Sequence, residues 1–100
     1  MSVIAEMSIF PMDKGTSLSP YVARAMKIIK DSGIDHHLTP MGTCIEGSWQ
    51  EVMQVVDKCF QDLSKDCDRI NLNMRVDYRS GGEKRMQEKV ESVQSKVQSS

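Results

Sequence analysis

The sequence predicts an α+β fold in which strands and helices follow the order β-α-β-β-α-β, with a further helix at the C-terminal end. Three observations lead to this prediction. Apolar and polar residues alternate with the period of a strand in two long segments, residues 2–10 and 69–79. Between these segments, apolar residues recur twice with the period of a helix. The length of 100 residues suits one domain, so we expect residues 1–100 to form a single domain.

The first predicted strand covers residues 2–10, because apolar side chains there alternate with Glu6 and Ser8. Pro11 ends the alternation, and residues 12–18 have the composition of a loop.

Ser19 and Pro20 introduce the first predicted helix. The serine hydroxyl can accept a hydrogen bond from a free N–H of the first turn, and proline fits there because it has no N–H. Gly33 is expected to end the helix in the left-handed conformation. The expected buried stripe consists of Val22, Met26 and Ile29.

Two short strands, residues 34–39 and 43–46, flank Pro40-Met41-Gly42 and are expected to pair as a hairpin. Ser48 and Glu51 then match a capping box at the start of the second helix. That helix is expected to end near residues 66–68. Its wide apolar stripe is formed by Val52, Val55, Val56, Cys59, Phe60 and Leu63.

The last strand, residues 69–79, is polar at every second position, and a turn is expected at residues 80–82. A final helix over residues 83–97 carries a narrow apolar stripe with heptad-like spacing. We expect this helix to serve oligomerisation, because its stripe needs a surface on which to pack. The stripe consists of Met86, Val90, Val93 and Val97.

This order of elements is that of a ferredoxin-like sandwich, in which two helices cover one face of a four-stranded antiparallel sheet. The opposite, open face then collects polar side chains. Carboxylates gathered there repel each other unless a cation, a proton or another chain compensates, so we expect copies of the chain to enclose part of this face. The open face comprises Glu6, Ser8, Asp35, His37, Thr39, Cys44, Glu46, Asn71, Asn73, Arg75 and Asp77.

The charge balance excludes several classes of protein. Thirteen Lys and Arg against fourteen Asp and Glu argue against a protein that neutralises nucleic-acid phosphates or binds membranes through a basic surface. No apolar run approaches the roughly 20 residues of a membrane span. The first residues carry no basic segment of a signal peptide, so we expect a cytosolic protein. The three cysteines, Cys44, Cys59 and Cys67, form no CxxC motif and are expected to act as small buried hydrophobes.

Several short motifs follow one another along nearly the whole chain: Ala5-Glu6-Met7-Ser8 with Pro11, Gly15 to Ala23, Ser32-Gly33-Ile34, Leu38 to Thr43, Ile45-Glu46-Gly47, and Val76-Asp77-Tyr78-Arg79. In order and spacing they resemble the small thiamine-binding protein family, the YkoF-like group. The pieces around the hairpin are the most specific. The resemblance implies a ferredoxin-like fold and dimers that pair into a tetramer. For some members it implies binding of thiamine or its hydroxymethylpyrimidine moiety.

A pocket for thiamine requires a carboxylate for the cation, hydrogen-bonding groups for the aminopyrimidine, and an apolar or aromatic wall. The chain offers Glu6 and Glu46 as the carboxylates. The remaining candidates are the hydroxyls of Ser8, Ser17 and Thr43 and the wall residues Tyr21 and Met41. No cofactor is expected.

Thr43 and Glu46 are the favoured pair, because both lie in the most specific motifs. Side chains alternate along a strand, so the two share one face only if Gly42 or Gly47 introduces a bulge. Ser17 has a second interpretation, as part of an anion-binding turn at a helix N-terminus.

Together with what the resemblance implies, the residues lead us to expect a non-catalytic homotetramer that binds a small heterocycle, and two alternatives stay open. The first is an isomerase or hydrolase that uses His37 with Glu6 or Asp77 in the same cleft. The second is a structural or regulatory assembly without a ligand. A metal site of His36, His37 and Cys44 is disfavoured, because adjacent strand residues point to opposite faces.

Overall fold

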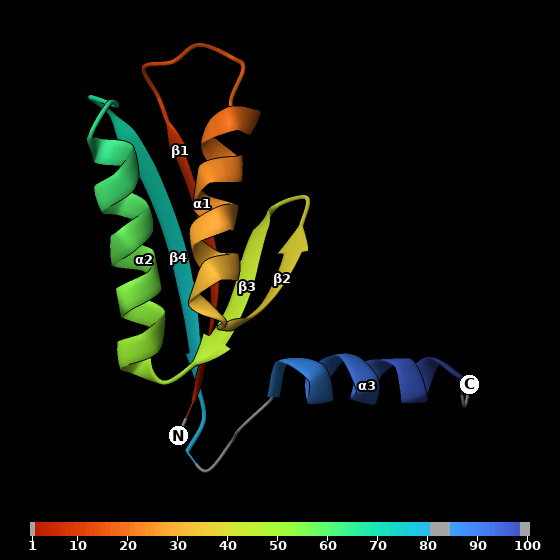
Figure 1. The fold of residues 1–100 in the computed structure, drawn as a ribbon. Coiled ribbons are helices and arrows are strands. Elements are labelled where there is room, and N and C mark those ends of the chain that lie inside the picture. The colour runs from red at the N-terminus through yellow and green to blue at the C-terminus, as the bar shows by residue number, and fades with distance from the viewer. Residues whose placement is uncertain (1, 81–84, 99–100) are drawn as a thin grey trace.

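The chain folds into a sheet covered by helices on one face, as seen in the computed structural model, which describes residues 2–80 and 85–98 (Figure 1). Within these residues four antiparallel strands and three helices are present, so the predicted α+β class is confirmed. Most of the predicted turn at residues 80–82 lies outside the described residues. In chain order the elements are β1 (Val3–Pro11), α1 (Ser19–Ser32), β2 (Asp35–Thr39), β3 (Gly42–Gly47), α2 (Trp49–Ser64), β4 (Ile70–Tyr78) and α3 (Arg85–Gln98).

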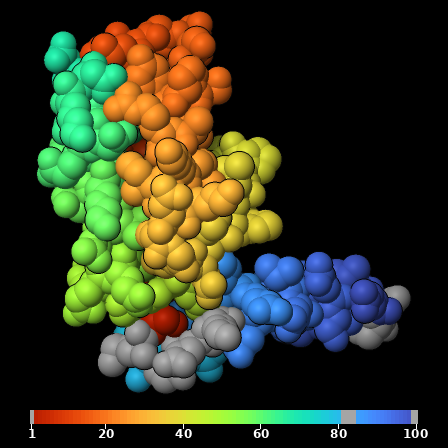
Figure 2. Space-filling model, viewed as in Figure 1, coloured from red at the N-terminus to blue at the C-terminus, as the bar shows by residue number. Residues whose placement is uncertain are grey.

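The strands are arranged in the order β2-β3-β1-β4, with each neighbouring pair antiparallel. Two β-α-β units therefore interleave, because β3 lies between β1 and β2, and β1 lies between β3 and β4. Helices α1 and α2 lie side by side over the same face of the sheet, whereas α3 extends away from it (Figure 1). Figure 2 shows α3 as an arm that stands out from the body of the molecule.

The alternation in β1 divides the sheet into two faces, as the sequence predicts. The residues that face α1 and α2 are almost completely buried, and they include Val3, Ala5, Met7 and Ile9. Glu6 points the other way and lies opposite Cys44 on β3 and Arg75 on β4. Continued along all four strands, this register places the predicted polar residues together on the open face.

The helix ends confirm the predicted capping box, the predicted stop at Gly33 and the predicted proline in the first turn of α1. The Glu51 N–H donates to Ser48 Oγ at 3.1 Å and the Ser48 N–H donates to Glu51 Oε1 at 2.9 Å, which completes the capping box. Gly33 follows α1 with a φ of 76°, in the left-handed conformation. The prediction that Ser19 caps α1 is wrong, because Ser19 is already the first helical residue. Leu18 occupies the cap position and makes no side-chain hydrogen bond there.

Some apolar residues predicted to be buried are partly exposed, because the two helices pack over the centre of the sheet. The edge strand β4 is covered incompletely, and Leu72 and Val76 are 40% and 41% exposed. Phe60 on α2 and Val22 on α1 lie at the outer margins of their helical stripes and are also exposed. The rest of the α2 stripe is buried as predicted.

The cysteines occupy different environments. Cys59 and Cys67 are buried, as predicted, whereas Cys44 on the open face is only half-buried. Burial raises the pKa of the Cys59 thiol to about 11, and burial together with Glu6 raises the pKa of the Cys44 thiol. Both are therefore protonated at neutral pH and are poor nucleophiles.

Among the described residues, no helix has the length and apolar character that crossing a membrane requires.

Candidate functional site

A groove of about 370 Å³ lies between α1 and the tip of the β2–β3 hairpin. The groove opens where β3 stops pairing with β1 while β4 continues to pair with it. The pairing of β1 with β3 ends at Met7 and Thr43, whereas the pairing of β1 with β4 continues to Pro11. Beyond Met7, β1 therefore forms the floor of a gap that neither β3 nor α1 fills. The apolar walls come from Phe10, Leu18, Val22, Met26, Leu38, Pro40 and Met41.

Two threonine hydroxyls lie in this groove, and they differ in how firmly they are bound. Thr39 Oγ1 donates to the Gly42 carbonyl at 2.9 Å and accepts from the Met41 N–H at 3.3 Å, so it is committed to the hairpin turn. Thr43 is buried, and its Oγ1 donates to Met26 Sδ at 3.3 Å. A thioether is a weak acceptor, so the Thr43 hydroxyl can be redirected to a ligand at little cost.

Gly42 allows the hairpin to approach β1 closely at the edge of the groove. Its φ is 153°, which disfavours other residues, and a Cβ built on it would lie 2.7 Å from the Met7 carbonyl oxygen. The groove therefore depends on a glycine at this position.

Three of the seven predicted site residues line this groove, namely Ser8, Met41 and Thr43. Met41 is 82% exposed at the rim, and Thr43 lies deep inside. Two others lie outside the groove lining. Ser17 is exposed in the loop before α1, and Tyr21 packs against the core with its ring 5.7 Å from the Arg24 guanidinium carbon.

The two predicted carboxylates lie on the opposite, open face. Glu6 lines a shallow hollow with Arg75 and Asp77. Glu46 lies at the far end of β3 from Thr43, and its carboxylate accepts hydrogen bonds from the start of α3. The register of β3 against β1 is continuous, without a bulge, so Thr43 and Glu46 point to opposite faces and do not meet.

The sequence interpretation missed most of the groove walls. Phe10, Met26 and Leu38 belong to three different elements, and only tertiary packing brings them together. The signal that could have found Leu38 is its place in the motif that runs to Thr43. A second hollow shares Val22, Met26 and Leu38 with the groove and adds Lys27, Lys30 and His36, so cations adjoin one end of an otherwise uncharged site.

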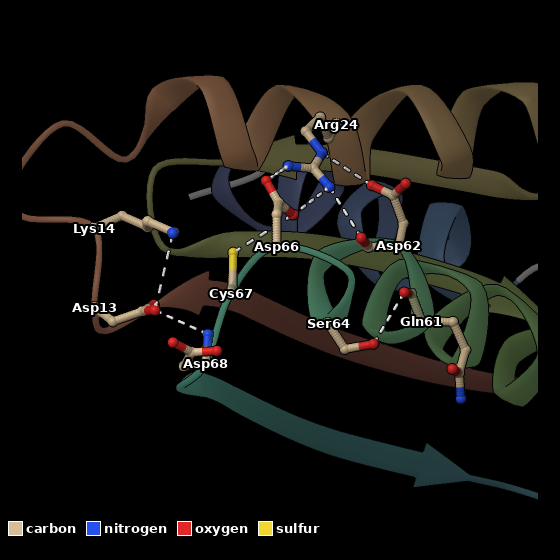
Figure 3. Close-up of polar contacts among 9 residues, drawn as sticks. All are labelled: Asp13, Lys14, Arg24, Gln61, Asp62, Ser64, Asp66, Cys67 and Asp68. Atoms are coloured by element: carbon tan, nitrogen blue, oxygen red, sulfur yellow. Dashed lines mark hydrogen bonds and ion pairs between the residues drawn. The ribbon is translucent and has the colours of Figure 1, made fainter.

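A polar network on the far side of α1 fixes this helix, and with it one wall of the groove (Figure 3). Arg24 on α1 binds the carboxylate of Asp62, in the last turn of α2, and that of Asp66, just after α2. Its Nε lies 3.0 Å from Asp62 Oδ2, and its Nη1 and Nη2 lie 2.9 and 3.0 Å from the two Asp66 oxygens. Below them, the Asp68 N–H donates to Asp13 Oδ2 at 2.8 Å, which ties the loop after β1 to the start of β4.

This network predicts a loss of stability in acid. The hydrogen bonds from Arg24 hold the pKa of Asp66 below its ordinary value of 3.8. A carboxylate with a lowered pKa stabilises the fold above its unfolded pKa, and this contribution is lost as the pH falls through the folded value. We expect the free energy of unfolding, measured by urea denaturation, to be flat from about pH 7 to 5 and to fall below about pH 4.

Asp13, Glu51 and Asp77 also have lowered pKa values, so the Arg24 contribution is isolated by comparison with Arg24→Gln. The difference in stability between the native chain and this variant should shrink as the pH falls. A difference that stays constant down to pH 2 would contradict the assignment.

A family model described as "Thiamine-binding protein" matches residues 5–94. The chain belongs to the thiamine-binding protein family. This family member is 34% identical to a UPF0045 protein from Synechocystis, and the match covers the whole chain and 84% of the relative's length. A UPF0045 protein from Methanocaldococcus jannaschii is 30% identical over 91% of each chain.

Two solved structures place this family member among known folds. A Thermotoga maritima protein, proposed to act in thiamine biosynthesis or salvage, superposes with a TM-score of 0.82. It is 26% identical, and the match covers 93% of this chain and 99% of the other. A hypothetical protein from M. jannaschii superposes with a TM-score of 0.85 at 29% identity, covering 92% and 95% of the two chains. In the described part of this thiamine-binding family chain, no group of three or more His, Cys, Asp or Glu could hold a metal ion.

Proposed function

We propose that the chain binds thiamine, or its hydroxymethylpyrimidine moiety, in the groove between α1 and the β2–β3 hairpin and does not transform it. The observation that carries this proposal is the groove itself, in which the buried Thr43 hydroxyl lies among apolar walls in a member of the thiamine-binding family. Its volume of about 370 Å³ falls within the range of roughly 300–1,000 Å³ of small-molecule sites.

The lining of the groove suits a flat heterocycle. Met26 and Met41 line the groove and provide polarisable walls, which favour aromatic and cationic rings. The Thr43 hydroxyl is the hydrogen-bonding group for the pyrimidine edge. Because Lys27 and Lys30 line the adjoining hollow, thiamine monophosphate should bind at least as tightly as thiamine.

Self-association belongs to the same proposal. Val90 and Val93 of the α3 stripe are exposed, and the family resemblance implies a homotetramer built as a dimer of dimers. The interleaved β-α-β units and the strand order support a ferredoxin-like assignment of the fold. The expected cytosolic location and the expectation that residues 1–100 form one domain remain predictions.

Calorimetric titration with thiamine, hydroxymethylpyrimidine and their phosphates tests the binding proposal. Thiamine should bind, and Thr43→Val should weaken binding about tenfold, because a methyl group replaces the hydroxyl that the ligand requires. The matched control is Thr16→Val, which removes the hydroxyl of an exposed loop residue and should leave the affinity unchanged within twofold. Absence of binding by the native chain, or equal effects of both variants, would refute the proposal.

The same titration, repeated with variants, tests whether the predicted site residues outside the groove take part in binding. Glu6, Ser17, Tyr21 and Glu46 lie outside the groove, so their substitution should not abolish binding if the groove is the site. Turnover of thiamine that His37→Ala abolishes would instead favour the enzyme alternative.

A further inference from the structure

The groove lacks a group that could neutralise a cationic ligand. No Asp or Glu is among the described residues that line the groove or the hollow beside it. The predicted carboxylates, Glu6 and Glu46, lie on the opposite face of the sheet. The thiazolium ring of thiamine is positively charged, and moving such a charge from water into an apolar groove is unfavourable unless an anion lies nearby. An anion carried by the ligand itself would remove this cost.

The adjoining hollow offers a place for such an anion. Lys27 and Lys30 of α1 and His36 of β2 line it, and it is continuous with the groove because Met26 and Leu38 line both. A ligand can therefore extend from the uncharged groove into a basic hollow.

The register places the cations one step beyond the hydroxyl of the groove. Leu38 is the register partner of Thr43, and Thr43 Oγ1 donates to Met26 Sδ, so the three side chains lie at one level. Lys30 lies one helical turn beyond Met26, a rise of about 6 Å. His36 lies two residues from Leu38 on the same face of β2, a step of about 7 Å. Both steps lead toward the turn that joins α1 to β2, so a ligand with its ring at Thr43 extends toward both cations.

The basic side chains of the hollow are free to bind a ligand. Lys27 and Lys30 are exposed, and neither forms an ion pair with another described residue. Arg24 on the same helix is instead held by the carboxylates shown in Figure 3. His36 Nδ1 lies 2.9 Å from the Ile34 carbonyl oxygen. Because a carbonyl only accepts, Nδ1 carries the hydrogen, and Nε2 is the ring nitrogen left for a ligand.

We propose that the groove and the hollow together select a heterocycle that carries a phosphate group on a short linker, with the ring beside Thr43 and the phosphate between Lys30 and His36. This inference rests on the proposed function and names the ligand class of that site. In thiamine monophosphate the phosphate compensates both the lysine charges and the charge of the ligand's own ring. Thiamine lacks this compensation and meets lysines of its own sign. Thiamine monophosphate should therefore bind at least about tenfold more tightly than thiamine.

Calorimetric titration of the full chain at low ionic strength measures the ratio of the two dissociation constants. Lys30→Gln should weaken binding of thiamine monophosphate about fivefold and leave that of thiamine unchanged, because only the phosphate contacts the lysine. The matched control is Lys58→Gln, which removes the same charge from an exposed position on α2 outside the groove and the hollow. This control should change neither affinity. Thr43→Val should weaken both ligands by the same factor and leave their ratio unchanged.

Hydroxymethylpyrimidine and its phosphate form a second pair that carries the same chemistry. The pair with the larger ratio identifies which phosphorylated heterocycle the site takes. Equal binding of the phosphorylated and unphosphorylated ligand in both pairs would overturn the inference and leave the proposed function intact. Equal losses in Lys30→Gln and Lys58→Gln would also overturn it, because the net charge of the chain would then account for the preference. Binding of none of the ligands would refute the proposed function itself, and this inference with it.

Discussion

Gly42→Ala is expected to lower the free energy of unfolding by about 3 kcal/mol and to weaken thiamine binding. The added Cβ would lie 2.7 Å from the Met7 carbonyl oxygen, a backbone atom that can move only if β1 or the hairpin shifts. The φ of 153° adds strain for any residue with a side chain. Because Gly42 also lines the groove, the shift would displace the neighbouring Thr43 hydroxyl.

Gly33→Ala is the matched control for this prediction. Gly33 has a φ of 76°, but a Cβ there meets no atom within 4 Å, so only backbone strain of about 1 kcal/mol is expected. Urea denaturation of both variants measures the difference. Equal losses would show that the close approach of the hairpin to β1 is not what requires glycine at position 42.

Ile45→Ala should lower the free energy of unfolding by about 3 kcal/mol, through lost burial and a cavity that the surroundings fill only partly. Ile45 is completely buried on β3, opposite Ala5 on the central strand β1. For a chain of this size the melting temperature should fall by roughly 12–24 °C.

Phe60→Ala provides the contrast, because Phe60 is 41% exposed although its position in the helical pattern predicts burial. We expect a loss of about 1 kcal/mol from this substitution. A larger loss from Phe60→Ala than from Ile45→Ala would contradict the description of the core.

Local patterns predict most of the secondary structure. Period-two alternation locates β1 and β4 to within about a residue, and the capping box of Ser48 and Glu51 starts α2 correctly. The same alternation predicts the open face, since strand parity alone decides which side chains share it. The prediction that Ser19 caps α1 missed the true cap position, Leu18, by one residue. Periodicity does not locate helix ends to a single residue.

The candidate site was predicted less well, because it depends on contacts between distant segments. Motif resemblance selected Ser8, Met41 and Thr43, and the groove contains all three. It also selected Glu46, but no sequence pattern reveals that the first turn of α3 occupies that carboxylate. Likewise, the exposure of Phe60 and Val76 follows from where two helices lie on a four-stranded sheet, which their own periodicity does not determine.

The most direct measurement of where thiamine binds is a titration of the chain with ¹³C-methyl-labelled methionines, followed by NMR. The eight methionines are natural probes, because Met26 and Met41 line the groove whereas Met53 and Met74 pack outside it and Met86 lies on α3. Binding in the groove should shift the methyl signals of Met26 and Met41 in a saturable way and leave those of Met53 and Met74 in place. Saturable shifts at Met86, with Met26 and Met41 unchanged, would contradict the groove as the site.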